Sequence, residues 1–238
     1  MKTVLITGAN KGIGFETVKQ MAQLGYFIYL GSRDKARGLD AVNKLKDQGI
    51  SNVELIEIDV TNIDSIKRAR QLLENKIEAL DVLINNAGIS GGHSQNLSTV
   101  DIDNLWKVFE TNFFGAVQTT QQFIELLKKS KQPVIVNVSS ELGSLTIHNS
   151  TQNPNYKIYD AYSSSKTALN ALTVLLANEF SNTNFKINSV SPGYTATDLN
   201  QFKGTQTVEQ GAKFIVQYAT LNNEGPTVKF FREEEIPW

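Results

Sequence analysis

The chain has 238 residues, 40% of them hydrophobic, and its 23 lysines and arginines against 24 acidic residues leave a formal charge of −1. This length and composition predict one ample globular core, and they exclude a disordered chain, a collagen and a disulfide miniprotein. The balanced charge argues against nucleic acid as the main partner, and the lack of cysteine excludes disulfides, thiolate metal sites and a cysteine nucleophile.

No membrane or targeting segment is visible in the sequence. No apolar run reaches the roughly 18 residues of a membrane span, and the first one, Val4-Leu5-Ile6, is too short for a signal peptide. A chain without cysteine also fits a reducing compartment. We therefore expect a cytoplasmic protein, complete from its first residue and without membrane contact.

Strand and helix signals alternate along the chain, because short apolar runs are followed by stretches with helical periodicity. Strands that are apolar throughout are typical of parallel sheets buried on both faces, and intervening helices imply right-handed βαβ crossovers. The pattern predicts a single doubly wound, Rossmann-type α/β domain over 1–238, with a mostly parallel sheet of about seven strands and helices on both faces. The expected strands are 2–6, 26–30, 53–58, 80–84, 133–138, 185–190 and 228–231, and the expected helices are 14–24, 35–48, 63–76, a long region at 100–129, 162–180 and 208–220.

Three glycines lie between the first strand and the first helix, in the loop Thr7-Gly8-Ala9-Asn10-Lys11-Gly12-Ile13-Gly14. Small residues let a backbone pass close to a pyrophosphate, and the following helix points free N–H groups and its positive end at the phosphates. Because the loop opens the first βαβ unit, it favours a nucleotide site. The alternative is a tight turn without a ligand.

Several motifs together resemble the short-chain dehydrogenases/reductases. They are TGANKGIG at 7–14, NNAG at 85–88, the set Ser140, Tyr162 and Lys166, and PGYTAT at 192–197. The resemblance covers essentially the whole chain. It is strongest to the carbonyl-reductase branch, through NKGIG in the loop, SRDKARG after the second strand and a tail that ends in IPW.

The end of the second strand bears on cofactor choice. Sites that prefer NAD usually have a carboxylate there, whereas this chain has Ser32 followed by Arg33. Serine removes repulsion towards a 2′-phosphate, and Arg33 offers it a bidentate fork. The resemblance assigns Lys11 and Arg33 to the 2′-phosphate of NADP, with Arg37 as a further cation. We therefore expect NADP (NADPH) as cofactor; the alternative is that these cations are solvated surface charges.

The resemblance also implies the other cofactor contacts. Asp59 could equally be the N-cap of the next helix, the NNAG segment could be a strand-ending turn, and the Pro-Gly pair could be a turn alone. The implied set is Gly8, Asn10, Lys11, Gly12, Ile13 and Gly14 at the pyrophosphate, Asp59 and Val60 at the adenine, Asn86, Ala87 and Gly88 at the adenine ribose, and Tyr162, Lys166, Pro192, Gly193, Thr195 and Thr197 at the nicotinamide end.

Tyr162 and Lys166 are four residues apart, so on a helix they share one face. A free tyrosine titrates near pH 10, and a nearby ammonium favours its phenolate. By resemblance, Tyr162 is the general acid, Ser140 binds the same carbonyl oxygen, and Asn112 orders a water that relays protons towards Lys166. Each feature also has a structural explanation, and Ser139 competes with Ser140.

Two segments depart from the simplest pattern. Residues 145–160 form a polar, turn-like insertion before the catalytic helix, and it resembles, in shorter form, the insertion of the carbonyl-reductase branch. It is placed to cover part of a helix through which many relatives pair, so a monomer is expected. The alternative is that it folds over the mouth of the active site and leaves that helix free. Residues 194–207 form the expected substrate lid, since beyond Asp198 they hold few core-type residues apart from Leu199 and Phe202. The two histidines, 55 positions apart at His93 and His148, predict no metal site.

Together these features predict NADPH-dependent reduction of an aldehyde or ketone. A dehydrogenase acting on an alcohol with NADP is the enzymatic alternative, and a catalytically idle NADP-binding redox sensor is the alternative from another class. A methyltransferase would leave the Tyr-Lys pair and NNAG unexplained.

Overall fold

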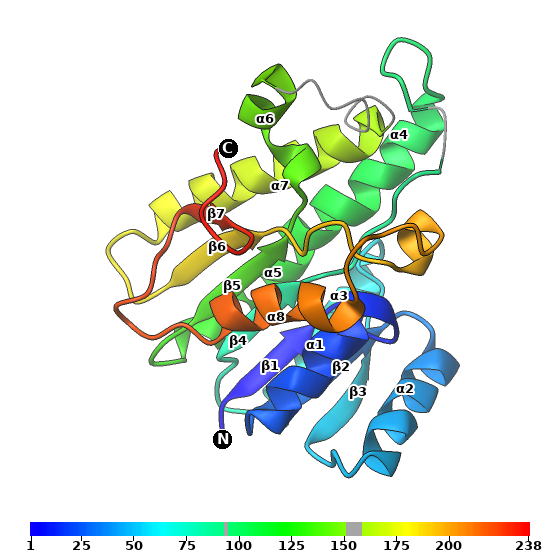
Figure 1. Ribbon diagram of the computed structural model, residues 1–238. Coiled ribbons are helices and arrows are strands. Elements are labelled where there is room, and N and C mark those ends of the chain that lie inside the picture. The colour runs from blue at the N-terminus through cyan, green and yellow to red at the C-terminus, as the bar shows by residue number, and fades with distance from the viewer. Residues whose placement is uncertain (93–94, 151–158) are drawn as a thin grey trace.

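A computed structural model describes residues 1–92, 95–150 and 159–238, and it has one sheet enclosed by helices (Figure 1). All strands are parallel, in the order β3-β2-β1-β4-β5-β6-β7. This confirms the doubly wound α/β fold. The strands are β1 (Thr3–Ile6), β2 (Phe27–Ser32), β3 (Val53–Glu57), β4 (Val82–Asn85), β5 (Val134–Val138), β6 (Lys186–Val190) and β7 (Lys229–Phe231).

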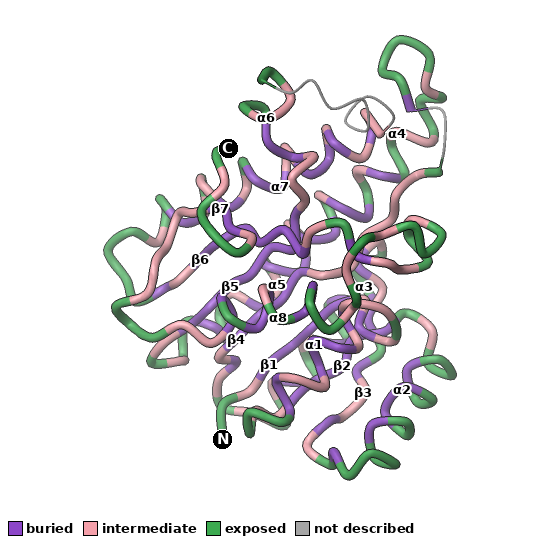
Figure 2. The backbone as a smooth tube through the Cα atoms, viewed as in Figure 1, coloured by how far each residue is buried: buried purple, intermediate pink, exposed green. Residues whose placement is uncertain are grey.

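Helices cover both faces of the sheet because successive strand residues point to opposite sides. Val4 and Ile6 pack in one core with α1 (Gly12–Gln23), α2 (Lys35–Asp47) and α8 (Val208–Ala219). Leu5 packs in the other core, with α3 (Ile63–Glu74), α5 (Gly115–Lys128) and α7 (Asp160–Glu179). Figure 2 shows the central strands β1, β4, β5 and β6 as almost continuously buried, whereas β3 at the edge of the sheet is only partly buried.

The long helical region at 100–129 is not one regular helix. It consists of α4 (Ile102–Phe109), a π-helical turn at Glu110–Phe114, and α5. The wider turn contains Asn112, which is 1% exposed. A π-helical turn inside an α-helix often occurs at functional sites, and here it directs a polar side chain inwards.

Polar side chains cross the centre of the sheet in one buried row. Asn85 donates to Asn137 (2.8 Å), and Asn137 donates to Thr173 of α7 (2.8 Å). Thr173 also bonds Ser189 of β6 at 2.8 Å. These bonds fix both the register of β4, β5 and β6 and the position of α7 on the sheet, because any slip would leave buried polar groups unpaired.

The segment after β5 differs from the sequence expectation of a polar turn. Glu141–Gly143 form a 3₁₀ turn, and Leu145–Ser150 form the short helix α6, whose start is capped by Ser144 through the amide of Ile147 (3.1 Å). The middle of the insertion, 151–158, lies outside the described residues, as does His93. In the described part of the chain, no helix is long and apolar enough to cross a membrane.

A C-terminal brace, residues 229–238, holds this same segment. Ser144 donates to the carbonyl of Pro237 (2.6 Å), and the amide of Thr146 donates to the carbonyl of Trp238 (3.0 Å). Arg232 donates to Glu141, the residue after Ser140, at 2.8 Å. The brace therefore fastens the chain that follows Ser140 at three points.

Candidate active site

The predicted site residues gather where the strands end. The order in which strands are added to the sheet reverses at β1, with β2 and β3 on one side and β4 to β7 on the other. Ligands of such sheets bind at the carboxyl ends of the strands beside that point. The loops after β1 and β4 are tied together there. The side-chain nitrogen of Asn86 donates to the carbonyls of Thr7 (2.8 Å) and Gly8 (3.1 Å), and the Thr7 hydroxyl accepts from the main-chain amides of Asn86 and Ala87.

The glycines of the first loop permit a close approach of these two loops. Gly8 has a φ of +63°, and a Cβ on it would lie 2.8 Å from Cα of Ala87. A Cβ on Gly14 would lie 2.5 Å from the amide nitrogen of Asn86. Gly12 has a φ of +58° and faces the methyl group of Thr197, 3.6 Å from where its Cβ would be. The glycine loop and the Thr197 segment therefore border the same site.

The N-terminus of α1 differs from those of its neighbours on the sheet. Asp34 caps α2, Asn62 caps α3 and Thr207 caps α8, each through its side chain. Within the described part of the chain, the N-cap of α1, Lys11, makes no such bond, and its first turn contains no acidic residue. Uncapped N–H groups at a helix start, next to a glycine loop, fit an anionic phosphate group.

Asp59 is not an N-cap. Asn62 caps α3 instead, accepting from the amide of Ser65 at 3.0 Å, while the Asp59 carboxylate accepts from the amide and hydroxyl of Thr61 (3.0 and 2.8 Å). The alternative that Asp59 is the N-cap of the next helix is therefore wrong. The next residue, Val60, is buried against Gly115.

The cations predicted for the 2′-phosphate are in different environments. Arg33 is exposed and, among the described residues, has no ion-pair partner. Nε of Arg37 lies 3.3 Å from a carboxylate oxygen of Asp34, so these two side chains form an ion pair. Lys11 pairs with Asp198 at 2.5 Å, and both side chains are about half exposed, at 59% and 50%. Ser32 is buried, and its hydroxyl donates to the carbonyl of Asp34.

The residues predicted to be catalytic meet on α7 and at the end of β5. Nζ of Lys166 lies 5.6 Å from the ring centroid of Tyr162 and donates to the carbonyl of Val138 at 2.8 Å. Tyr162 is hydrogen-bonded to Ser140. The alternative, Ser139, is buried and directs its hydroxyl at the main-chain carbonyl of Lys166 (3.5 Å). Geometry therefore favours Ser140 over Ser139 as the partner of Tyr162.

Burial shifts both titrating groups. Desolvation raises the pKa of Tyr162 to about 12, although the Ser140 hydrogen bond acts in the opposite direction. Desolvation lowers the pKa of Lys166 to about 8. In this arrangement Tyr162 is a neutral phenol at neutral pH, and Lys166 is poised to exchange a proton there.

Asn112 connects this set to the loop after β4. Its side-chain oxygen accepts from the amide of Ile89 (2.8 Å), and its nitrogen donates to the carbonyl of Ile89 (2.9 Å) and to the hydroxyl of Ser165 (3.0 Å). A Cβ on Gly88 would lie 3.4 Å from the Asn112 oxygen and 3.6 Å from Nζ of Lys166. Gly88, Asn112 and Lys166 are therefore immediate neighbours.

The PGYTAT segment folds back on itself. The hydroxyl of Thr195 donates to the carbonyl of Pro192 (3.0 Å), and Gly193 has a φ of +74°. Further along, Leu199 is 41% exposed and Phe202 is 67% exposed, so neither is a core residue. The predicted lid thus presents apolar side chains to solvent.

Two features were missed from the sequence. Gln95, fully buried, accepts a hydrogen bond from the amide of Tyr162. The Arg232–Glu141 pair adjoins Ser140. Neither has a local signal, because each depends on contacts between segments far apart in the chain.

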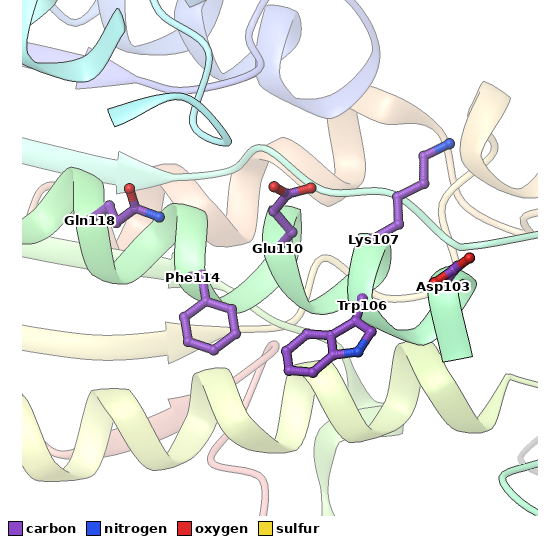
Figure 3. A pocket seen from close by; sticks show the side chains of 6 residues that line it. All are labelled: Asp103, Trp106, Lys107, Glu110, Phe114 and Gln118. Atoms are coloured by element: carbon purple, nitrogen blue, oxygen red, sulfur yellow. The ribbon is translucent and has the colours of Figure 1, made fainter. Parts of the chain in front are cut away.

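A separate pocket is lined by residues of α4, the π-helical turn and the start of α5 (Figure 3). The rings of Trp106 and Phe114 project from the same side of this helical segment, and these residues are 62% and 41% exposed. It contains none of the predicted site residues; its lining is Asp103, Trp106, Lys107, Glu110, Phe114 and Gln118. Among the residues that the structure describes, no three His, Cys, Asp or Glu side chains could hold a metal ion together.

Comparison with known proteins places this geometry in a family. The family model "short chain dehydrogenase" matches residues 2–208. The chain is 32% identical to a (+)-neomenthol dehydrogenase of Capsicum annuum, over 98% of this chain and 96% of that one. Among solved structures, salutaridine reductase from Papaver somniferum superposes with a TM-score of 0.86 at 28% identity, covering 98% of this chain and 100% of that one. NADPH-bound carbonyl reductase from chicken fatty liver superposes with a TM-score of 0.86 at 25% identity, covering 100% and 99%.

Proposed function

The chain belongs to the short-chain dehydrogenase family, and from this premise we propose that it is an NADP-dependent oxidoreductase that reduces an aldehyde or ketone to an alcohol, with Tyr162 as proton donor. The observation that carries the proposal is the convergence of Tyr162, Ser140 and Lys166 beside the loops that follow β1 and β4. The family match covers most of the chain, and the names of the relatives describe oxidoreductases.

The residues present fit nicotinamide adenine dinucleotide phosphate (NADP). The uncapped start of α1 suits the pyrophosphate, and exposed Arg33 suits a 2′-phosphate where a carboxylate would repel it. Asn86 to Gly88 lead from the glycine loop towards Lys166, and this position beside the glycine loop suits the adenine ribose. The NADPH in the chicken carbonyl reductase structure supports the same choice of cofactor. NADPH supplies the hydride when it is bound.

The side chains divide the remaining work. Tyr162 donates its phenolic proton to the substrate oxygen, and the Ser140 hydroxyl binds the same oxygen and orients it. The raised pKa of Tyr162 keeps the donor protonated before the reaction. Lys166, whose pKa of about 8 is close to neutral, stabilises the phenolate that remains and returns a proton to it. Asn112 orders a water on the route by which that proton reaches Lys166.

The decisive experiment measures NADPH oxidation by the purified protein across a panel of aldehydes and ketones. We expect turnover with at least one class, and a loss of about 10²–10⁴-fold in Tyr162→Phe with NADPH binding retained. Tyr26→Phe is the matched control, since Tyr26 packs against the core on the α1 side of the sheet and should keep full activity. Cofactor binding without turnover on any carbonyl would instead favour the redox-sensor alternative.

A further inference from the structure

Gln95 lies in the loop between β4 and α4, and it is fully buried although its side chain is polar. Both the nitrogen and the oxygen of its side-chain amide form hydrogen bonds. The nitrogen donates to the carbonyls of Ser90 (2.6 Å) and Gly92, and the oxygen accepts from the amide of Tyr162 at 2.9 Å. A buried amide with all of these groups paired is costly to replace, because each lost partner leaves another polar group unsatisfied.

The amide that Gln95 binds belongs to the first turn of α7. The first intrahelical bond there runs from the amide of Ser163 to the carbonyl of Tyr159 (2.7 Å), so the amide of Tyr162 comes before the regular ladder. Amides in this position need an acceptor from outside the helix. Gln95 supplies that acceptor from a distant loop, 67 residues earlier in the chain.

The carbonyl of Tyr162 is held as well. It accepts from the hydroxyl of Ser165 (2.7 Å), which accepts from Asn112 (3.0 Å). Asn112 in turn holds both main-chain groups of Ile89, at the start of the loop that Gln95 fastens. The hydrogen bonds therefore form a closed ring that passes through Asn112, residues 89–92, Gln95 and both backbone groups of Tyr162.

We propose that Gln95 is a positioning residue for Tyr162: it fixes the first turn of α7 so that the phenol stays in register with Ser140 and Lys166. The proposal rests on the proposed function for its catalytic consequence, whereas its structural part stands on this hydrogen-bond ring. A misplacement of about 1 Å at reacting groups can lower a rate about a hundredfold, so a frayed first turn would reduce turnover without touching the cofactor site.

The test compares Gln95→Met, which keeps the length of the side chain but removes its amide, with Gln132→Met. Gln132 precedes β5, at the end of that strand opposite Ser140, and its side chain donates to the carbonyl of Leu221 (2.9 Å). It is therefore a matched control far from the site. In Gln95→Met we expect kcat to fall about tenfold to a hundredfold with the NADPH dissociation constant unchanged. The Tyr162 amide should also exchange its hydrogen faster, as followed by NMR. Gln132→Met should change neither.

The outcomes separate the two proposals. If the wild-type protein reduces no carbonyl compound, the proposed function fails, and hydrogen exchange at Tyr162 still tests the role of Gln95. If Gln95→Met keeps wild-type kcat and a protected Tyr162 amide, Gln95 does not position Tyr162. Should that variant not fold, the wild-type protein decides: a slowly exchanging Tyr162 amide supports the proposal, and a freely exchanging one overturns it.

Discussion

Lys166 should make the stability of the cofactor-free protein depend on pH in a predictable way. Its side chain is buried, with the residue only 4% exposed, and its ammonium donates to the carbonyl of Val138. Burial lowers its pKa from 10.5 to about 8. The perturbation is Lys166→Met, which keeps an unbranched side chain and removes the charge.

The sign follows from proton binding. Between the folded pKa of about 8 and the unfolded value of 10.5, the unfolded chain binds more protons, so the folded state gains stability as pH rises through this range. At about 1.4 kcal/mol per pKa unit, the buried charge costs about 3 kcal/mol at pH values near 7. About 2 kcal/mol of this cost is relieved by a pH of about 9.5, where the lysine is neutral in the folded state but still mostly charged in the unfolded chain.

Urea unfolding of the wild-type protein and Lys166→Met, each at these two pH values, measures the effect. The free energy of unfolding of the wild type should increase by about 2 kcal/mol relative to the variant between the lower and the higher pH. Comparing two pH values removes any change in packing, because packing does not titrate, and the Lys166–Val138 bond is already part of the balance that sets the folded pKa. Lys129→Met, an exposed control, should follow the wild type. Parallel pH profiles for wild type and Lys166→Met would refute the reasoning.

Three further predictions concern the cofactor and assembly. Arg33→Ala should weaken NADPH binding by about 1.5 kcal/mol or more, about tenfold, and leave NADH binding unchanged by calorimetry; equal losses would remove Arg33 from the 2′-phosphate site. Asp198→Asn should release Lys11 from an ion pair between half-exposed side chains, and such a pair contributes about 0.2–1 kcal/mol. The variant should therefore bind NADPH about 1.5- to 5-fold tighter than the wild type and bind NADH as the wild type does; weaker NADPH binding would contradict this. Light scattering at micromolar concentration should give the mass of one chain, 26.4 kDa, whereas two or four chains that persist on dilution would show that residues 145–160 do not prevent pairing.

The fold was predictable from the sequence because its signals are local. Each strand is a short apolar run and each helix has its own periodicity, so the parallel orientation of the strands followed from alternation alone. The expected bounds differ from the observed ones by a few residues at most, as at β4, where the run Leu80 to Ile84 becomes Val82–Asn85. The motif residues also gathered at one edge, since parallel strands end on the same side of a sheet.

What the sequence did not reveal depends on contacts between distant segments. Nothing near Gln95 indicates that its partner is the amide of Tyr162, and nothing near Glu141 points to Arg232. The helix at Leu145–Ser150 is polar and short, and it is capped by Ser144 and bound to the brace rather than stabilised by its own periodicity. Lys11 was assigned by its place in the glycine loop, and its pairing with Asp198 arises from a segment 187 residues away.

The C-terminal brace sets an order of events during synthesis. Glu141 and Ser144 bind partners 91 and 93 residues further along the chain. At translation rates of about 5–20 residues per second, those partners are made roughly 5–20 s later. During that interval the segment after Ser140 lacks its three fastenings, and both cores still lack side chains from α7, β6, α8 or β7. The fastenings depend on the last ten residues of the chain, so this edge of the candidate site is among the last parts of the fold that can be completed.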